Sequence, residues 1–326
     1  MHMPKYMKAM VLASALGLGG WHQLGHSVSG PVAASVDVTR LALFDVQAVA
    51  GRLVAVGERG AIVTSLDQGR TWQMGQALTD RTLTALAFQG EVGLAVGHGG
   101  SLLRSADGGQ SWAKVAVKDA GTDSILGVTA LHDGRFVAYG SFGLYLVSSD
   151  RGLTWVRQPT ISPEFDRHIS KVIEAGGKLL LVGESGTLAV SSDGGSTWAA
   201  LSSPYEGSLF GALALSDGAW LVYGMRGNVF RSSDEGKTWS KVSFPAVVAI
   251  NGGAIGPNGQ VVLVGNDGVM AVSADNGRNF SSSNVPVRLP LAQASFARDG
   301  ALVYVGYLVA GRQDRAATRP APVSKP

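Results

Sequence analysis

The chain has 326 residues, of which 45% are hydrophobic and 16% charged, with 45 glycines, 12 prolines and no cysteine. The missing cysteines exclude disulfides and thiolate metal sites, and a formal net charge of only +3 argues against a nucleic-acid-binding protein. Many glycines and few charges favour a large core with many short turns, and hence one all-β domain.

The first 29 residues have the pattern of a secretory signal. Lys5 and Lys8 precede an apolar stretch over 9–20, and small residues follow it as candidate cleavage sites. The stretch is too short to span a bilayer comfortably, and an uncleaved anchor is the alternative. We therefore expect export to a periplasm or a thylakoid-lumen-like compartment, with membrane association if the segment is retained.

Residues 35–40 come next and alternate polar and apolar side chains, which predicts a strand with one buried face. A motif, Ser-x-Asp-x-Gly-x-Thr/Ser-Trp, then occurs five times and once more in a weaker form. Its aspartate and closing aromatic residue are Asp67 and Trp72, Asp107 and Trp112, Asp150 and Trp155, Asp193 and Trp198, Asp234 and Trp239, and Asp275 and Phe280.

Successive aspartates of this motif are 40, 43, 43, 41 and 41 residues apart, a period typical of propellers and solenoids. We interpret the motif as a hairpin turn, in which the carboxylate accepts backbone N–H groups and the glycine takes a positive φ. The aromatic residue then opens a strand, and we expect it to pack between neighbouring sheets.

A second marker, Gly-x-x-Gly, separates two apolar runs in each repeat and predicts a tight hairpin. Each repeat therefore contains four strands, with Gly-x-x-Gly between the second and third and the Asp turn between the third and fourth. The six pairs are Gly57/Gly60, Gly97/Gly100, Gly140/Gly143, Gly183/Gly186, Gly224/Gly227 and Gly265/Gly268.

A seventh, incomplete repeat follows, because 291–296 and 301–306 have the pattern of first and second strands, and 307–312 comes after them without an Asp turn. A propeller can complete such a sheet with a strand from the other end of the chain. The sequence thus predicts a seven-bladed β-propeller over 30–311, with four-stranded antiparallel blades and Asp-box turns, closed by the N-terminal strand over 35–40. Residues 312–326 are rich in Arg, Ala and Pro, which predicts a disordered basic tail; an arm that meets an anionic membrane is the alternative.

The repeated Asp motif resembles the Asp-box, or BNR, repeat of β-propellers over essentially the whole chain after the leader. Together with Gly-x-x-Gly and a period near 41 residues, it most resembles the photosystem II stability and assembly factor family and its relatives in bacteria without photosystems. The resemblance implies an exported, monomeric, non-enzymatic scaffold or assembly factor that binds a membrane protein or membrane-associated complex, such as a transporter or a photosystem subunit. Family members carry a basic patch, and only Arg104 and Arg231 match the arginine that commonly ends the third strand.

Asp boxes also occur in sialidases, so an exo-glycosidase of the sialidase type is the alternative function. The Phe-Arg-Ile-Pro motif of sialidases is absent, and Tyr139, Tyr223 and Tyr304 lie in second strands, where we interpret them as packing residues. The six histidines lack metal-site spacing, and each Asp turn offers one carboxylate, too few for calcium. We expect no catalytic residue, no cofactor and no metal.

In a four-stranded blade, the Gly-x-x-Gly hairpins and the joins between repeats lie on one face and the Asp turns on the other. Variable loops favour the first face for partner binding, and a mixture of charged and aromatic side chains suits a protein surface better than a sugar pocket. The longest join, 158–168, is either part of this surface or a solvated connector with Phe165 beneath it. The predicted partner-binding residues are Glu58, Arg59, His98, Phe142, Phe165, Arg167, His168, Glu184, Arg226 and Asp267.

Overall fold

The computed structural model describes residues 35–283, 285 and 288–314. The predicted signal segment over 1–29 lies outside these residues, as does the predicted disordered tail over 312–326 apart from its first three residues. Arg312 and Gln313 belong to a strand, Val309–Gln313, so the prediction is wrong for these two residues. Within the described part of the chain, no helix is both long and apolar enough to cross a membrane.

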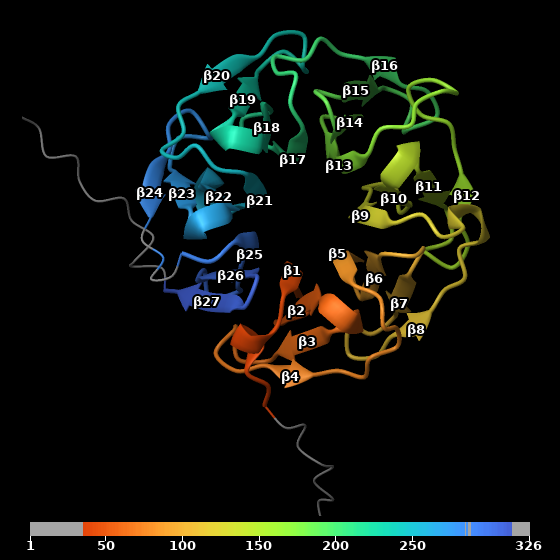
Figure 1. Ribbon diagram of the computed structural model, residues 1–326, viewed down its shortest axis with the longest axis vertical. Helices are drawn as coiled ribbons and strands as arrows, with labels where there is room; N and C mark the ends of the chain where they lie inside the picture. The colour runs from red at the N-terminus through yellow and green to blue at the C-terminus, as the bar shows by residue number, and fades with distance from the viewer. Residues whose placement is uncertain (1–34, 284, 286–287, 315–326) are drawn as a thin grey trace, which may run out of the picture. The chain divides into compact units, whose positions relative to one another are not determined.

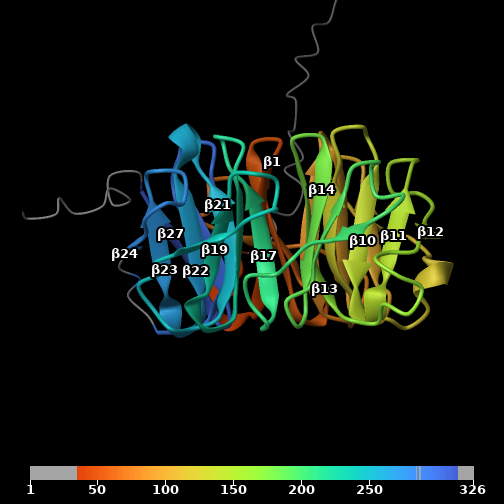
Figure 2. The ribbon, with the colours of Figure 1, turned by 90° about the horizontal axis from the view of Figure 1, so that it is seen from above.

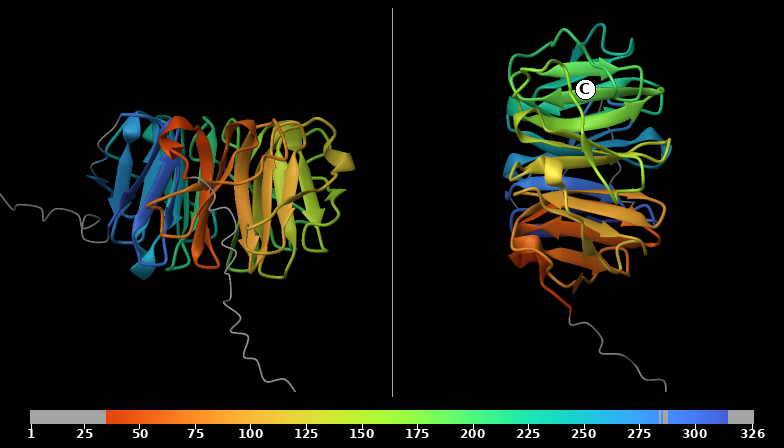
Figure 3. Two further views of the ribbon diagram at one scale, coloured as in Figure 1. Left: turned by 90° about the horizontal axis from the view of Figure 1, so that it is seen from below. Right: turned by 90° about the vertical axis from the view of Figure 1, so that its right-hand side faces the viewer.

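Seven antiparallel sheets stand in a ring, so the predicted seven-bladed β-propeller is confirmed (Figure 1). Side views show the sheets packed against one another with their strands running along the axis of the ring (Figures 2 and 3). In every sheet the strands follow chain order, the first at the centre and the last at the rim.

Blades 1 to 3 contain β1 (Leu43–Val49), β2 (Arg52–Gly57), β3 (Ile62–Ser65) and β4 (Gln73–Met74); β5 (Leu83–Gln89), β6 (Val92–Gly97), β7 (Leu102–Ser105) and β8 (Ala113–Lys114); and β9 (Ile125–Ala130), β10 (Phe136–Gly140), β11 (Tyr145–Ser148) and β12 (Val156–Arg157). Blades 4 to 6 contain β13 (Ile169–Ala175), β14 (Lys178–Gly183), β15 (Leu188–Ser191) and β16 (Ala199–Ala200); β17 (Leu209–Ala214), β18 (Trp220–Gly224), β19 (Val229–Ser232) and β20 (Ser240–Val242); and β21 (Ile250–Ile255), β22 (Val261–Gly265), β23 (Met270–Ser273) and β24 (Ser281–Ser283). Blade 7 has three strands, β25 (Leu291–Phe296), β26 (Leu302–Gly306) and β27 (Val309–Gln313).

The remaining elements of the described chain are single turns of 3-10 helix, which lie in hairpins and in the joins between blades. They are η1 (Val38–Arg40), η2 (Glu58–Gly60), η3 (Lys118–Ala120), η4 (Ser141–Gly143), η5 (Met225–Gly227), η6 (Pro257–Gly259) and η7 (Asn266–Gly268).

The hydrophobic core lies between blades. Each buried cluster combines side chains of two neighbouring sheets, and the Asp-box aromatic residues contribute to these clusters as predicted. Trp198 of blade 4, for example, packs edge-on against Tyr145 of blade 3, with ring centroids 5.6 Å apart. Each blade is therefore stabilised by its neighbours.

The prediction that residues 35–40 form the fourth strand of the last sheet is wrong. Ser35 forms a bridge with Gln73 at the rim of blade 1, and residues 38–40 form η1. The cause is local, because the Asp37 carboxylate accepts the Thr39 N–H at 3.1 Å and the Thr39 hydroxyl at 2.6 Å, which caps a turn instead of a strand. Val38 is then buried between blades 7 and 1.

The ring closes between blades 7 and 1 through contacts other than a shared sheet. Ala42 forms an isolated bridge with Tyr307, and the Leu308 N–H donates to the Leu41 carbonyl at 3.1 Å. On the opposite face, the Arg312 guanidinium donates to the Gln68 carbonyl at 2.6 Å. Backbone hydrogen bonds, side-chain hydrogen bonds and packing therefore hold the two ends of the ring together.

Candidate functional site

The Gly-x-x-Gly hairpins and the joins between blades lie on one face of the ring, which we call the hairpin face. The Gly143 N–H donates to the Arg167 carbonyl at 2.9 Å, and the Gly186 N–H donates to the Gly207 carbonyl at 3.0 Å, so hairpin and join are in contact. The Asp turns lie on the other face, where the Gly108 N–H donates to the Glu91 carbonyl in the turn between β5 and β6 at 2.8 Å.

The two glycines of each hairpin serve different purposes. The first is extended, and a Cβ on Gly140 would lie 2.0 Å from the Ser124 carbonyl oxygen, so the strand leaves no room for a side chain. The second, Gly143, has a φ of +66°, which glycine adopts without strain. Between them, Phe142 also has a positive φ of 53°, and its side chain is 59% exposed.

In two hairpins, the first of the two residues between the glycines accepts a hydrogen bond from a backbone N–H at the start of the same blade. The Glu58 carboxylate accepts the Ala42 N–H at 3.2 Å, and the Glu184 carboxylate accepts the His168 N–H at 3.1 Å. Two predicted partner-binding residues are thus already engaged in holding the fold, while the second variable position presents its side chain to solvent.

Five of the ten predicted partner-binding residues meet at the junction of blades 3 and 4, where Phe142 and His168 pack edge to face with ring centroids 5.2 Å apart. The Phe142 N–H donates to Nδ1 of His168 at 3.3 Å, and the Arg167 guanidinium donates to the Ser185 carbonyl at 3.3 Å. We call this group the Phe142 cluster; its members are Phe142, Phe165, Arg167, His168 and Glu184. Phe165 is half-buried beneath it, as one of the two predictions for the long join expected.

The other predicted partner-binding residues lie on separate hairpins around the ring and do not join the Phe142 cluster. Arg59, His98, Arg226 and Asp267 are exposed on blades 1, 2, 5 and 6, and Glu58 is half-buried on blade 1.

Sequence reasoning missed three exposed apolar side chains of the hairpin face. Val247, in the join after blade 5, is 83% exposed and lies beside the hairpin that carries Met225. Tyr307 and Leu308 form the hairpin of blade 7 and are 55% and 39% exposed. The position of Tyr307 and Leu308 between a second and a third strand could have identified them as hairpin residues. This hairpin, however, lacks the second glycine that marks the others.

On the opposite face, each Asp turn contains the same pattern of hydrogen bonds, as predicted from the motif. In blade 4, Asp193 accepts the Thr197 hydroxyl at 2.6 Å, the Thr197 N–H at 2.9 Å and the Ser191 hydroxyl at 2.7 Å. These hydrogen bonds, with the Thr197 hydroxyl first, lower the pKa of Asp193 to about 2. The aspartates are therefore structural acceptors, and their oxygens are occupied.

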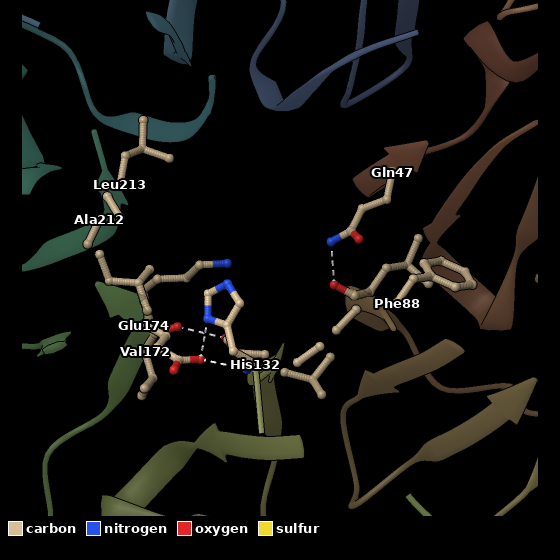
Figure 4. Close-up of a pocket in the computed structure, with 15 residues that line it drawn as sticks. Gln47, Phe88, His132, Val172, Glu174, Ala212 and Leu213 are labelled. Carbon is tan, nitrogen blue, oxygen red and sulfur yellow. Dashed lines mark hydrogen bonds and ion pairs between the residues drawn. The ribbon is translucent and has the colours of Figure 1, made fainter. Parts of the chain in front are cut away.

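A cavity of about 330 Å³ opens in the central channel between the first strands of blades 1 to 5 (Figure 4). Gln47, Phe88, His132, Glu174 and Leu213 line it from five different blades. His132 Nδ1 lies 2.9 Å from a Glu174 carboxylate oxygen, which also accepts the His132 N–H at 2.7 Å. The cavity is large enough for a small ligand.

Two ionisable residues of the first strands, Asp45 and Lys171, affect each other's pKa. The Asp45 carboxylate accepts the Leu86 N–H of the next blade at 2.7 Å and the Val46 N–H at 2.8 Å, while burial raises its pKa. The pKa of Lys171, which lines the cavity, is raised by Tyr139 and, against the effect of burial, by Asp45. Lys171 and Asp45 thus carry opposite charges, and each favours the charged form of the other.

Arg104 and Arg231, the arginines that match the family's third-strand ending, form hydrogen bonds to the neighbouring blade. Arg104 donates to the Arg151 carbonyl at 2.8 Å, and Arg231 donates to the Asn276 carbonyl at 3.1 Å. Arg312 donates in the same way to Gln68. In each case a third strand is tied to the Asp turn of the next blade, so these side chains are structural.

Comparison with protein families gives two matches that together span the ring. Residues 153–319 match the model described as DUF6242 beta propeller domain, and residues 32–160 match the model described as Photosynthesis system II assembly factor YCF48. None of the curated proteins compared with the chain matches it significantly.

Solved structures with the same fold include two YCF48 proteins. One, described as YCF48 bound to D1 peptide, has a TM-score of 0.70 and 19% identity over 86% of this chain and 94% of that chain. YCF48 from Cyanidioschyzon merolae has a TM-score of 0.69 and 18% identity, over 86% and 98% of the two chains. A streptogramin B lyase has a TM-score of 0.74 and 11% identity, over 85% and 95%. At such identities the structures establish the fold and leave the activity open.

Proposed function

We propose that this chain, which belongs to the DUF6242 beta propeller domain family, is a non-enzymatic scaffold or assembly factor. Its first part resembles YCF48. In this proposal the hairpin face binds a membrane protein or a membrane-associated complex. The D1 peptide bound by a structural neighbour is consistent with a partner of this kind.

The observation that carries the proposal is the set of apolar side chains that the hairpin face exposes. Phe142, Met225, Val247, Tyr307 and Leu308 come from blades 3, 5 and 7 and are each at least 38% exposed. Exposed large apolar side chains among polar ones are typical of protein interaction surfaces. The turns of blades 3 and 5 are held by their two glycines and by backbone hydrogen bonds, such as that from the Asn228 N–H to the Met225 carbonyl at 3.1 Å, and not by these side chains.

The sialidase-type alternative has less support. Among the described residues that line the central cavity there is no arginine to bind a substrate carboxylate and no tyrosine to act as nucleophile. Tyr139 and Tyr223 are buried over Gly127 and Gly211 of the adjacent strands. Their positions agree with the packing role inferred from the sequence.

We also propose that the protein acts after export, because of the Lys5 and Lys8 pattern and the apolar stretch that follows it. The N-terminal sequence of the protein purified from its host compartment tests this. A chain recovered from the cytoplasm that still begins at Met1 would contradict export.

Site-specific photo-crosslinking tests the binding face. A crosslinking residue placed at Phe142 or Met225 on the hairpin face, or at Leu66 or Leu153 on the Asp-turn face, compares four exposed positions in otherwise identical proteins. With membranes of the host, we expect one defined membrane protein to be crosslinked from the hairpin face and not from the other. Equal crosslinking from both faces, or turnover of a fluorogenic sialoside by the purified protein, would overturn the proposal.

A further inference from the structure

The residue that precedes the first strand occupies the same place in all seven blades. Its carbonyl accepts the N–H of the first hairpin residue of the same blade, as when Glu184 donates to His168 at 3.0 Å and Met225 donates to Ser208 at 3.1 Å. Besides His168, the residues at this place are Ala42, Thr82, Ser124, Ser208, Ala249 and Pro290. Among these seven described residues, only His168 has a side chain that ionises near neutral pH.

The His168 side chain contacts the hairpin of the preceding blade. Its Nδ1 accepts the Phe142 N–H at 3.3 Å, and the two rings pack edge to face with centroids 5.2 Å apart. Ser208 makes the equivalent contact one blade further on, where its hydroxyl oxygen accepts the Ser185 N–H at 3.4 Å. The contact is therefore a cap across a blade junction, and at Phe142 the acceptor of this cap is a titratable ring.

The cap on Phe142 depends on the charge of the His168 ring. A ring nitrogen of histidine accepts a hydrogen bond only when it carries no proton, so the contact requires a bare Nδ1. The histidine side chain changes its charge between about pH 5 and about pH 8. With a proton on Nδ1, two donors face each other, and the hydrogen bond from the Phe142 N–H is lost.

Glu184 offers the protonated ring another partner. One of its carboxylate oxygens lies 4.0 Å from Nδ1 of His168, and the same oxygen accepts the His168 backbone N–H at 3.1 Å. The two side chains are each 45% exposed, which leaves the ring room to turn. A hydrogen bond between charged groups is stronger than one between neutral groups, so the protonated ring favours Glu184 over Phe142.

The other charged groups near the ring lie in the same join. Asp166 and Arg167 precede His168, and the Arg167 guanidinium donates to the Ser185 carbonyl at 3.3 Å. The blade 3 hairpin, Ser141–Gly143, contains no ionisable side chain. Glu184 is thus the carboxylate that the structure places beside Nδ1.

The blade 3 hairpin keeps its turn without the cap. Phe142 has a φ of 53°, and Arg226 and Asp267 have φ values of 55° and 57° at the equivalent places of blades 5 and 6. The next blades supply Ala249 and Pro290 there, whose side chains contain no acceptor. Loss of the cap therefore frees the tip of the hairpin and leaves the blade folded.

We propose that His168 is a positioning residue of the hairpin face, and that it makes the presentation of Phe142 depend on pH. The neutral ring holds the exposed Phe142 side chain in one place, and the protonated ring turns to Glu184 and releases it. The effect on a partner rests on the proposed function, in which the hairpin face is the binding surface, whereas the release of Phe142 does not.

An NMR titration of the full-length protein from about pH 8 to about pH 5 tests the cap without a partner. We expect the Phe142 amide proton to move upfield with the same midpoint as the His168 ring, because its hydrogen bond is lost. In His168→Gln, whose amide takes up no proton in this range, the Phe142 signal should stay constant. His98→Gln, at the exposed histidine of the blade 2 hairpin, is the matched control and should titrate like the wild type.

Photo-crosslinking from Met225 to membranes of the host, at both ends of this pH range, tests the effect on binding. With subsaturating protein, we expect the yield of the wild type to fall about two- to tenfold in acid, and that of His168→Gln to stay the same. No crosslinking at either pH would count against the proposed function, and the titration of Phe142 would still decide the role of His168.

Three results would contradict the role of His168. The Phe142 amide could stay constant while the His168 ring titrates, which would mean that packing alone holds the hairpin tip. The amide could respond equally in the wild type and in His168→Gln. Crosslinking could also fall equally in these two proteins, which would assign the pH dependence of binding to another group. The dispersion of the NMR signals verifies that each variant is folded.

Discussion

At the scale of single residues, one aspartate organises each turn of the Asp-turn face. Its two carboxylate oxygens accept hydroxyl and backbone N–H donors from the residues that follow, and the serine at the start of the motif donates to it while accepting the N–H of the motif glycine, as in Ser191 with Gly195 at 2.8 Å. Because a charged carboxylate is the better acceptor, the turn favours the ionised form. The pKa values of all six aspartates fall to about 2.

The lowered pKa values of these aspartates predict that the folded protein loses stability in acid. A folded-state pKa of about 2, below the ordinary value of 3.8, means that each aspartate adds stability above pH 4, and that this contribution is lost as the pH falls from about 4 to about 2. Urea unfolding between pH 6 and pH 2.5 measures it. Asp193→Asn should be less stable at pH 6 but should lose less on acidification; identical pH profiles would contradict the role of the carboxylate.

Trp198→Ala should destabilise the protein by about 3–5 kcal/mol, because it empties a large site between blades 3 and 4. The indole is 8% exposed and packs against Tyr145. Chemical denaturation gives the free energy of unfolding. Leu66→Ala, at a side chain that is 62% exposed, is the control and should change stability by less than about 0.5 kcal/mol. A loss below about 1 kcal/mol for Trp198→Ala would mean that the indole contributes little to the junction.

At the scale of elements, the hairpin between the second and third strands repeats one solution in six blades. The first glycine admits the carbonyl of the preceding join, and the second glycine makes the turn. The second of the two residues between them differs from blade to blade, so one blade presents Phe142 and another Arg226 on the same backbone. The hairpin face can therefore change its chemistry without changing the fold.

Gly224→Ala tests the close approach, since its Cβ would lie 2.2 Å from the Ser208 carbonyl oxygen. The backbone there is extended, with a φ of −176°, so the cost comes from steric overlap and not from a forbidden conformation. We expect a loss of about 1–3 kcal/mol, measured by denaturant unfolding. Met225→Ala, which truncates the exposed side chain of the next residue, should leave the free energy of unfolding nearly unchanged. Equal effects of the two changes would show that the carbonyl moves aside easily.

At the scale of the whole molecule, neighbouring blades are joined by packing and by side chains that cross the junctions. Arg104, Arg231 and Arg312 occupy equivalent positions on third strands and bind the carbonyl of the next Asp turn. Arg312 matters most for the ring, because its partner Gln68 lies at the other end of the chain. It also binds Asp299 at 2.7 Å.

Arg312→Ala should therefore loosen the junction of blades 7 and 1, with a local cost of about 1.5–3 kcal/mol for the lost charge-assisted hydrogen bonds. Hydrogen exchange of the segments around Ala42 and Tyr307 reports on that junction. Arg104→Ala removes the equivalent contact between blades 2 and 3 and should leave those segments unchanged. If both variants had the same exchange pattern, Arg312 would have no special part in closing the ring.

The sequence by itself determined the repeat, the blade number and the two kinds of turn, because these follow from short-range chemistry. An aspartate followed by glycine, or two glycines around a two-residue tip, fixes a turn through contacts within a few residues, and the period then fixes the blades. The aromatic residues were predictable as packing groups for the same reason.

Only the tertiary structure decided how the ring closes and which candidate residues meet. Residues 35–40 alternate like a strand, yet the Asp37 cap turns them into η1 and places Ser35 on blade 1. The Phe142 cluster depends on the distance between a hairpin and a join 26 residues further along the chain, and the arginine contacts join residues up to 244 positions apart. Such contacts depend on how blades pack against each other, and a periodic pattern, which repeats identically in each blade, carries no information about them.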